Sequence, residues 1–176
     1  MPDSHQHKPL EDITLLGVLS DTHDHPDAAA AGIQTLRAAG AQFLIHCGDV
    51  GRERILDLLT GIPAAFVWGN TDYDHGSLTQ YAADLGIQCA NDFADLKFAN
   101  KKIAVTHGDN PKLIQHAINP TSKFDYLFVG HTHIPTDQRL GHIRIINPGA
   151  LHRTTKKTVA IVDLKTGTVR HLIVKI

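Results

Sequence analysis

The sequence has few cysteines and no excess charge of either sign. Its two cysteines, Cys47 and Cys89, are too few for a disulfide framework or for a zinc site built on thiolates. Lys and Arg number 17 against 18 Asp and Glu, so the formal net charge is −1. This balance argues against a general nucleic-acid binder and against a polybasic membrane-surface protein.

Long hydrophobic runs are also missing. No apolar run approaches the roughly 18 residues of a membrane-spanning helix, and the polar N-terminal segment lacks the apolar stretch of a signal peptide. We therefore expect a cytoplasmic protein without a membrane partner. Residues 1–12 are charged and aperiodic, which predicts a flexible N-terminal segment, and residues 13–176 have the length of a single domain.

Histidine, in contrast, is abundant. The chain carries 13 histidines against one tryptophan and one methionine. Histidine is the commonest metal ligand among the side chains, and it titrates near neutral pH. The histidines therefore point to a metal site as the first function to consider.

Short apolar runs alternate with amphipathic segments in the first half of the chain. They predict strands at 13–20, 43–46 and 64–67 and helices at 26–39, 52–60 and 77–85. Such alternation implies right-handed crossovers and a largely parallel sheet. The second half predicts one helix near 111–117, hairpin turns at Asn100-Lys101 and Thr166-Gly167, and strands at 87–89, 93–98, 101–106, 125–129, 142–147, 157–163 and 168–175.

Polar clusters follow five of the predicted strands directly. They are Asp21-Thr22-His23, Gly48-Asp49, Gly69-Asn70, His107-Gly108 and Gly130-His131-Thr132-His133. In open α/β sheets, ligands bind at the carboxyl ends of strands, so the five clusters can converge on one site. Their oxygen and nitrogen donors suit Mn, Fe, Zn or other first-row divalent ions. Seven donors exceed the needs of one tetrahedral ion and fit two ions if one carboxylate bridges them.

The order DxH, GD, GN, HG and GHxH resembles that of the calcineurin-like metallophosphoesterases. The short chain, the GHTH motif and the segment Asn147-Pro148-Gly149 are similar to the small bacterial and archaeal phosphodiesterase branch. The resemblance runs from Ile13 to the C-terminus. It implies an α/β fold, a four-layer α/β/β/α sandwich of mixed sheets flanked by helices.

The resemblance also implies roles for the seven donors. Asp21, His23 and His133 match ligands of a first metal, and Asn70, His107 and His131 match ligands of a second. Asp49 matches the bridging carboxylate, and Asp49 and Asn70 are the expected catalytic residues. The implied cofactors are two divalent ions, foremost Mn, with Fe, Zn, Ni or Co as alternatives. A hydroxide held between the two ions would attack the phosphorus.

The sequence departs from the family pattern beside the expected pocket. Many members have a histidine after the asparagine, which helps to protonate the leaving group, whereas this chain has Thr71. Thr is a poor general acid, so we predict a preference for diesters or for esters whose leaving group departs easily. The fourth motif ends in Asp109 instead of histidine, and Ala150 replaces the serine of NPGS. Candidate substrate contacts are Thr71, Asp72, Asp109 and Arg153.

Other residues have more ordinary interpretations. We predict that His46 is a packed structural imidazole and that Trp68 belongs to the core. Asp24, Asp72 and Asp109 are either partners that orient ligand imidazoles or plain loop carboxylates. His25, His75 and His152 could border the site from loops, whereas His116, His142 and His171 are expected at the surface.

The leading hypothesis is a metal-dependent phosphodiesterase or phosphatase that acts on a small phosphate ester. One alternative is a protein-interaction scaffold of the same fold, like the retromer subunit whose metal site has eroded, but none of the seven donors is eroded here. Another alternative is a small nuclease or dinucleotide phosphodiesterase. The strongest basic cluster, Arg153 with Lys156 and Lys157, is modest. The sequence leaves open whether the chain forms a homo-oligomer.

Overall fold

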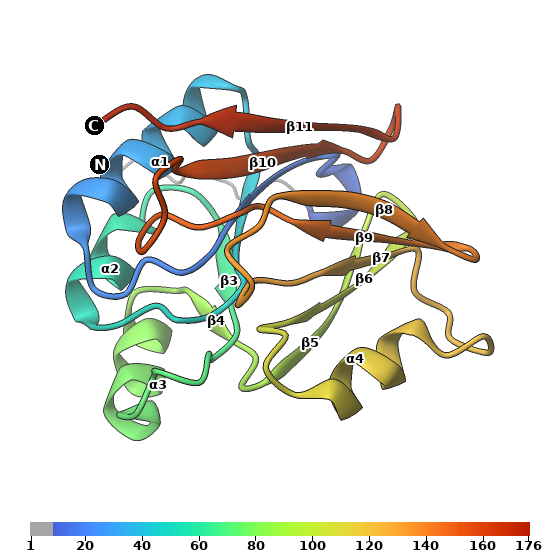
Figure 1. Ribbon diagram of the computed structural model, residues 1–176. Coiled ribbons are helices and arrows are strands. Elements are labelled where there is room, and N and C mark those ends of the chain that lie inside the picture. Colours follow the sequence, from blue (N-terminus) through green and yellow to red (C-terminus); the bar gives the residue numbers. More distant parts are fainter. Residues whose placement is uncertain (1–8) are drawn as a thin grey trace.

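The computed structural model describes residues 9–176 as two mixed β-sheets between helices (Figure 1). The first sheet has the order β11 (Thr168–Ile173), β10 (Thr158–Asp163), β1 (Leu15–Leu19), β2 (Phe43–His46), β3 (Ala64–Phe66) and β4 (Gln88–Cys89). The second has the order β5 (Phe93–Phe98), β6 (Lys101–Thr106), β7 (Tyr126–Phe128), β9 (Ile143–Asn147) and β8 (Thr136–Leu140). Strands β1 to β4 run parallel, as predicted, and β10 adds to β1 antiparallel.

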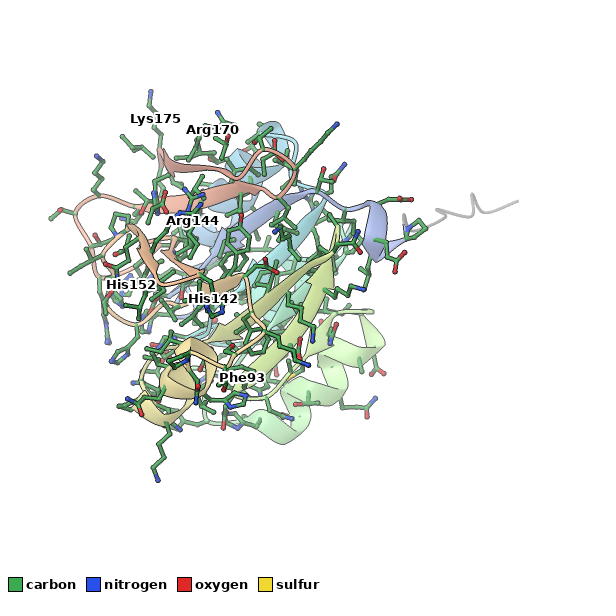
Figure 2. The ribbon with its side chains drawn as sticks, turned by 90° about the vertical axis from the view of Figure 1, so that its right-hand side faces the viewer. Phe93, His142, Arg144, His152, Arg170 and Lys175 are labelled. Carbon is green, nitrogen blue, oxygen red and sulfur yellow. The ribbon has the colours of Figure 1, made fainter. Side chains whose placement is uncertain are left out.

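Helices cover the outer faces of both sheets. They are α1 (Pro26–Ala38), α2 (Glu53–Leu58), α3 (His75–Asp84) and α4 (Pro111–Ile118). The first three lie together on one side of the molecule, and α4 lies on the other (Figure 1). Phe93 of β5 contacts α4 through His116, with ring centroids 5.3 Å apart (Figure 2). The layers therefore follow the order α/β/β/α, which confirms the predicted sandwich.

Strand β1 shows why the predicted apolar runs are continuous. Leu16 and Val18 pack into the core between the two sheets, whereas Leu19 packs into the core beneath the helices. Because successive side chains of a strand point to opposite faces, a strand buried on both faces has no polar alternation.

The structure differs from the predictions at strand β8 and at the hairpin between β5 and β6, and it describes the predicted flexible N-terminal segment only in part. Strand β8 was missed because it lies at the edge of the second sheet with mostly exposed side chains, so no apolar alternation marks it. Leu10–Asp12, within the predicted flexible segment, form a short 3-10 helix, while residues 1–8 of that segment lie outside the described residues. The hairpin between β5 and β6 turns at Ala99-Asn100, where φ is 46° and 63°, one residue before the predicted position.

Within residues 9–176, none of the helices is long and apolar enough to cross a membrane.

Candidate metal centre

The loops that follow five strands bring the predicted donors to one place. Asp21 and His23 follow β1, Asp49 follows β2, Asn70 follows β3, His107 follows β6, and His131 and His133 follow β7. The carboxyl ends of β1 to β3 meet those of β6 and β7 of the second sheet at this edge. Both sheets therefore contribute to a single site, as the strand-end pattern predicts.

Two buried carboxylates form the floor of the site. Asp21 is 0% exposed and Asp49 is 2% exposed. Oδ2 of Asp49 lies 3.4 Å from Nε2 of His23 and 3.4 Å from Nε2 of His107. His23 belongs to the predicted first ligand set and His107 to the second. Asp49 therefore lies between the two sets, where a bridging carboxylate is expected. Burial of two carboxylates is costly unless cations compensate their charge.

Two groups of donors have the spacing of metal ligands. In each group, Asp21, His23 and His133 or Asp21, Asp49 and His107, the donor atoms lie within 4.8 Å of one another. The first group is the predicted first ligand set. Asp21 is common to both groups, a sharing that the sequence does not reveal.

Asn70 and His131 lie on the open side of the cluster, where both residues are exposed. Oδ1 of Asn70 is 3.0 Å from Nε2 of His107. The His131 ring centroid is 5.1 Å from that of His107, and the His131 backbone N–H donates to Oδ2 of Asp21. Both predicted donors thus lie beside His107, with which the resemblance groups them.

The backbone at five of the donors has left-handed dihedral angles. The φ angles are 56° at Asp21, 45° at His23, 53° at Asp49, 64° at His131 and 59° at His133. Such conformations cost on the order of 1–3 kcal/mol for residues other than glycine and concentrate at functional sites. Their recurrence at one site indicates that these side chains are held for function.

Unpartnered polar atoms test whether this donor set fits a metal. Among residues 9–176, Oδ1 of Asp21 and Nε2 of His23 are buried without a hydrogen-bond partner. Nε2 of His133 lies 3.0 Å from that carboxylate oxygen, yet the two atoms do not form an aligned hydrogen bond. Buried acceptors that face each other in this way need a cation between or beside them. The residues therefore fit divalent metal ions.

The electrostatics of Asp49 and His107 favour positive charge at the site. Burial raises the pKa of the Asp49 carboxyl, but hydrogen bonds from His107 and the Thr71 N–H outweigh burial and hold the pKa well below its usual range. Burial lowers the pKa of His107, yet the Asp49 carboxylate beside it raises the pKa to about 9. Metal binding at such a site is expected to displace the proton from the imidazole.

Backbone and hydroxyl groups orient the imidazoles. Nδ1 of His107 donates to the Cys47 carbonyl oxygen at 2.8 Å, which leaves Nε2 for the centre of the site. His46 is fully buried, with Nε2 2.9 Å from Oγ1 of Thr22. Burial lowers the pKa of His46 to about 3, so it is neutral and structural, as predicted.

A cavity of about 430 Å³ opens beside the metal centre. It is lined by His23 and Thr71 at the centre and also by Tyr73, His152 and Arg153. Of the candidate substrate contacts, Thr71 and Arg153 therefore lie at this cavity. The Thr71 N–H donates to Oδ1 of Asp49 at 2.9 Å, and its hydroxyl lies 3.4 Å from Nδ1 of His23.

The structure does not bring the other two candidates to that cavity. Asp72 is 5% exposed, and its carboxylate accepts the backbone N–H groups of Val50, Gly51 and Gly69 at 2.8–3.1 Å. Asp109 is exposed at a separate cavity of about 100 Å³ that Trp68 and Gly69 also line.

The remaining histidines follow the predictions in part. His25 and His152 border the cavity as a stacked pair, with ring centroids 3.6 Å apart and His152 at the edge of the molecule (Figure 2). His75 is not in a loop: it begins α3 and stacks on the buried Trp68. His116 and His142 are exposed, but His171 is half-buried, and its Nε2 contacts the Asn147 carbonyl oxygen at 2.7 Å.

Sequence reasoning missed Tyr73 and Arg52, which also line the cavity. Tyr73 is the one aromatic residue in the polar stretch from Gly69 to Gly76 apart from His75, a pattern that could have marked it for display. No comparable signal marks Arg52, because its place depends on how the loop after β2 folds.

Known proteins share this sequence pattern and fold. Residues 15–167 match the family described as the calcineurin-like phosphoesterase superfamily domain. A phosphodiesterase of Methanocaldococcus jannaschii is 25% identical over 165 residues, which cover 91% of this chain and 99% of that protein. A probable metallophosphoesterase of the same organism is 30% identical over 143 residues, 77% of this chain and 67% of the relative. A solved structure described as a novel archaeal phosphodiesterase has a TM-score of 0.83 at 24% identity and covers 91% of this chain and 99% of its own.

Proposed function

The chain belongs to the calcineurin-like phosphoesterase superfamily, and we propose that it is a metal-dependent hydrolase of phosphodiesters. The proposed ligands of two divalent ions, with Mn²⁺ as the first candidate, are Asp21, His23, Asp49, Asn70, His107, His131 and His133. The observation that carries the proposal is the pair of buried carboxylates facing imidazoles, with Oδ1 of Asp21 and Nε2 of His23 left without partners among the described residues.

When bound, two divalent ions supply Lewis acidity and a water molecule acidic enough to act as a nucleophile near neutral pH. The protein's own residues hold and orient the centre. Asp21 and Asp49 provide the negative charge that binds the cations. The Thr71 N–H fixes Oδ1 of Asp49, so that Oδ2 faces His23 and His107.

Arg153 supplies a cation at the cavity for a phosphoryl oxygen. It lines the cavity with His23, and within residues 9–176 its guanidinium makes no ion pair. A free arginine can bind phosphate oxygens through two parallel hydrogen bonds. Loss of Arg153 is therefore expected to weaken substrate binding more than turnover.

Two observations support diesters over monoesters. At the position where many family members have an imidazole, Thr71 offers a hydroxyl, which is a poor general acid for an alkoxide leaving group. The M. jannaschii relative that covers nearly the whole chain is named a phosphodiesterase. We propose a small phosphate ester as the substrate, without general nucleic-acid binding, and a cytoplasmic location stays a prediction.

The test is hydrolysis of bis(p-nitrophenyl) phosphate by protein stripped with chelator and reloaded with Mn²⁺. We expect metal-dependent turnover that falls at least a hundredfold in Asp49→Asn, since loss of a metal-holding carboxylate removes transition-state stabilisation. Asp95→Asn, at an exposed position on β5, is the matched control and should keep wild-type activity. Metal binding without turnover of any ester would favour the scaffold alternative.

A further inference from the structure

Tyr73 is displayed without a packing partner. Its residue is 87% exposed, more than any other large hydrophobic residue in the described part of the chain. It belongs to none of the three core clusters, and within residues 9–176 its hydroxyl makes no hydrogen bond. Burial of an aromatic ring stabilises a fold, so a ring left in solvent contributes nothing to stability and is available to a ligand.

The backbone on both sides of Tyr73 is fixed. The preceding residue, Asp72, is held by three backbone N–H groups through its carboxylate. The backbone carbonyl oxygen of Asp72 lies 2.7 Å from Nε2 of His75. The His75 ring in turn stacks on Trp68, with a centroid distance of 4.6 Å and an interplanar angle of 5°. The loop therefore presents the Tyr73 ring on an ordered support, which lowers the entropy cost of binding.

The ring lines the same cavity as the metal centre. His23 and Thr71 line this cavity at the centre, so an ester group on a phosphate held there would extend into it. Its volume of about 430 Å³ falls in the range of small-molecule pockets. The stacked rings of His25 and His152 give it a second flat surface.

Arg153 is the cation at the cavity that forms no ion pair within residues 9–176. The carboxylates of Glu53 and Asp74, which also line the cavity, form no ion pair there either, whereas Asp24 is paired. Asp24 accepts two hydrogen bonds from Arg54, and Arg52 lies 3.7 Å from the same carboxylate. The cavity thus combines one unpaired cation, suited to phosphate, with flat aromatic surfaces. A short alkyl ester would use the cation and leave the rings uncovered.

We propose that this cavity binds a flat aromatic ring carried by an ester oxygen of the phosphodiester, and that Tyr73 determines this specificity by stacking on the ring. The inference rests on the proposed function, because the metal centre must hold the phosphate. An aryl group and a nucleobase share the required chemistry, since each offers a flat π surface.

Binding of phosphonates, which are not hydrolysed, tests the proposal apart from turnover. Calorimetry on the Mn²⁺-loaded protein would compare phenylphosphonate, cyclohexylphosphonate, methylphosphonate and the phosphonate analogue of thymidine 5′-monophosphate. Stacking on one ring predicts that the flat compounds bind roughly tenfold more tightly than the other two. Tyr73→Ala should remove this preference, and Tyr73→Phe should restore it.

The control variant is Leu140→Ala, at an exposed position of β8, and it should keep the wild-type preference. An upfield shift of the Tyr73 ring protons on addition of phenylphosphonate is the expected NMR signature. The proposal is overturned if cyclohexyl and phenyl compounds bind equally, if the preference survives in Tyr73→Ala, or if none of the phosphonates binds. A Tyr73-dependent preference without hydrolysis of any diester would instead overturn the hydrolase and leave the aromatic subsite standing. A comparison of the affinities of the thymidine analogue and of phenylphosphonate shows whether the cavity prefers a nucleobase or a simple aryl group.

Discussion

Two buried histidines have pKa values that are shifted in opposite directions. The Asp49 carboxylate raises the pKa of His107 to about 9 against the effect of burial, whereas burial lowers the pKa of His46 to about 3. The order of motifs predicts the seven proposed donors, because residue type and sequence position are both visible, and the structure brings these seven side chains to one place. The shared position of Asp21 was not predictable, since it depends on which loops meet in space. The sequence could mark Tyr73 as exposed, but not its place at the cavity beside the metal centre.

Acid should destabilise the metal-free protein partly through His46. In the folded state its pKa is about 3, whereas an unfolded histidine titrates near 6.5. Below pH 6.5 the unfolded state therefore binds a proton at this histidine, whereas the folded state does not. The free energy of unfolding falls by up to about 1.4 kcal/mol per pH unit until about pH 3. Urea unfolding at pH 7 and pH 4.5 would measure this loss.

The variant His46→Gln isolates this contribution, because its amide can still donate to Oγ1 of Thr22. We expect a smaller loss of stability between the two pH values than in the wild type. His116→Gln, at an exposed position of α4, should keep the wild-type loss. Equal losses in wild type and His46→Gln would show that His46 does not carry the effect.

At the scale of elements, burial decides what the sequence reveals. Strands buried on both faces, such as β1, stand out as apolar runs, and the glycines at 40 and 86 mark where α1 and α3 end. The sequence of the edge strand β8 is polar and cannot be distinguished from that of a loop. The site depends on a close approach of the loops after β2 and β3, where a Cβ at position 69 would overlap Asp49.

Two glycine substitutions should therefore have opposite effects. Gly69→Ala forces the loop after β3 away from Asp49 and should lower stability by about 1–3 kcal/mol and weaken Mn²⁺ binding. Gly76→Ala, in α3 with no atom within 4 Å of the added Cβ, should raise stability by about 0.5–1 kcal/mol. Thermal unfolding and Mn²⁺ titration of both variants would measure these changes. A Gly69→Ala protein with unaltered Mn²⁺ affinity would contradict the close approach.

At the scale of the whole molecule, the fold and the site have separate sources of stability. Three apolar clusters fill the space between the sheets and beneath the helices, and none of them includes a proposed metal ligand. The net charge of −1 is compatible with an anionic substrate, because the proposed metal ions can supply the positive charge that a phosphate needs.

Metal removal should leave the protein folded. With chelator present, we expect an unchanged far-ultraviolet circular dichroism spectrum, because the cores do not depend on the metal. The melting temperature should fall, since Mn²⁺ binds the folded state and not the unfolded chain, with a stabilisation of about 2.7 kcal/mol at one hundred times the dissociation constant. Loss of secondary structure on chelation would mean that the metal is structural.

The central claim is that the seven donors hold two divalent ions. Calorimetric titration of chelator-stripped protein with Mn²⁺, with the bound metal counted by elemental analysis after gel filtration, tests it most directly. Two ions per chain in the wild type and fewer in Asp49→Asn are the predicted results. Binding of no ion, or equal binding by the wild type and Asp49→Asn, would contradict the account.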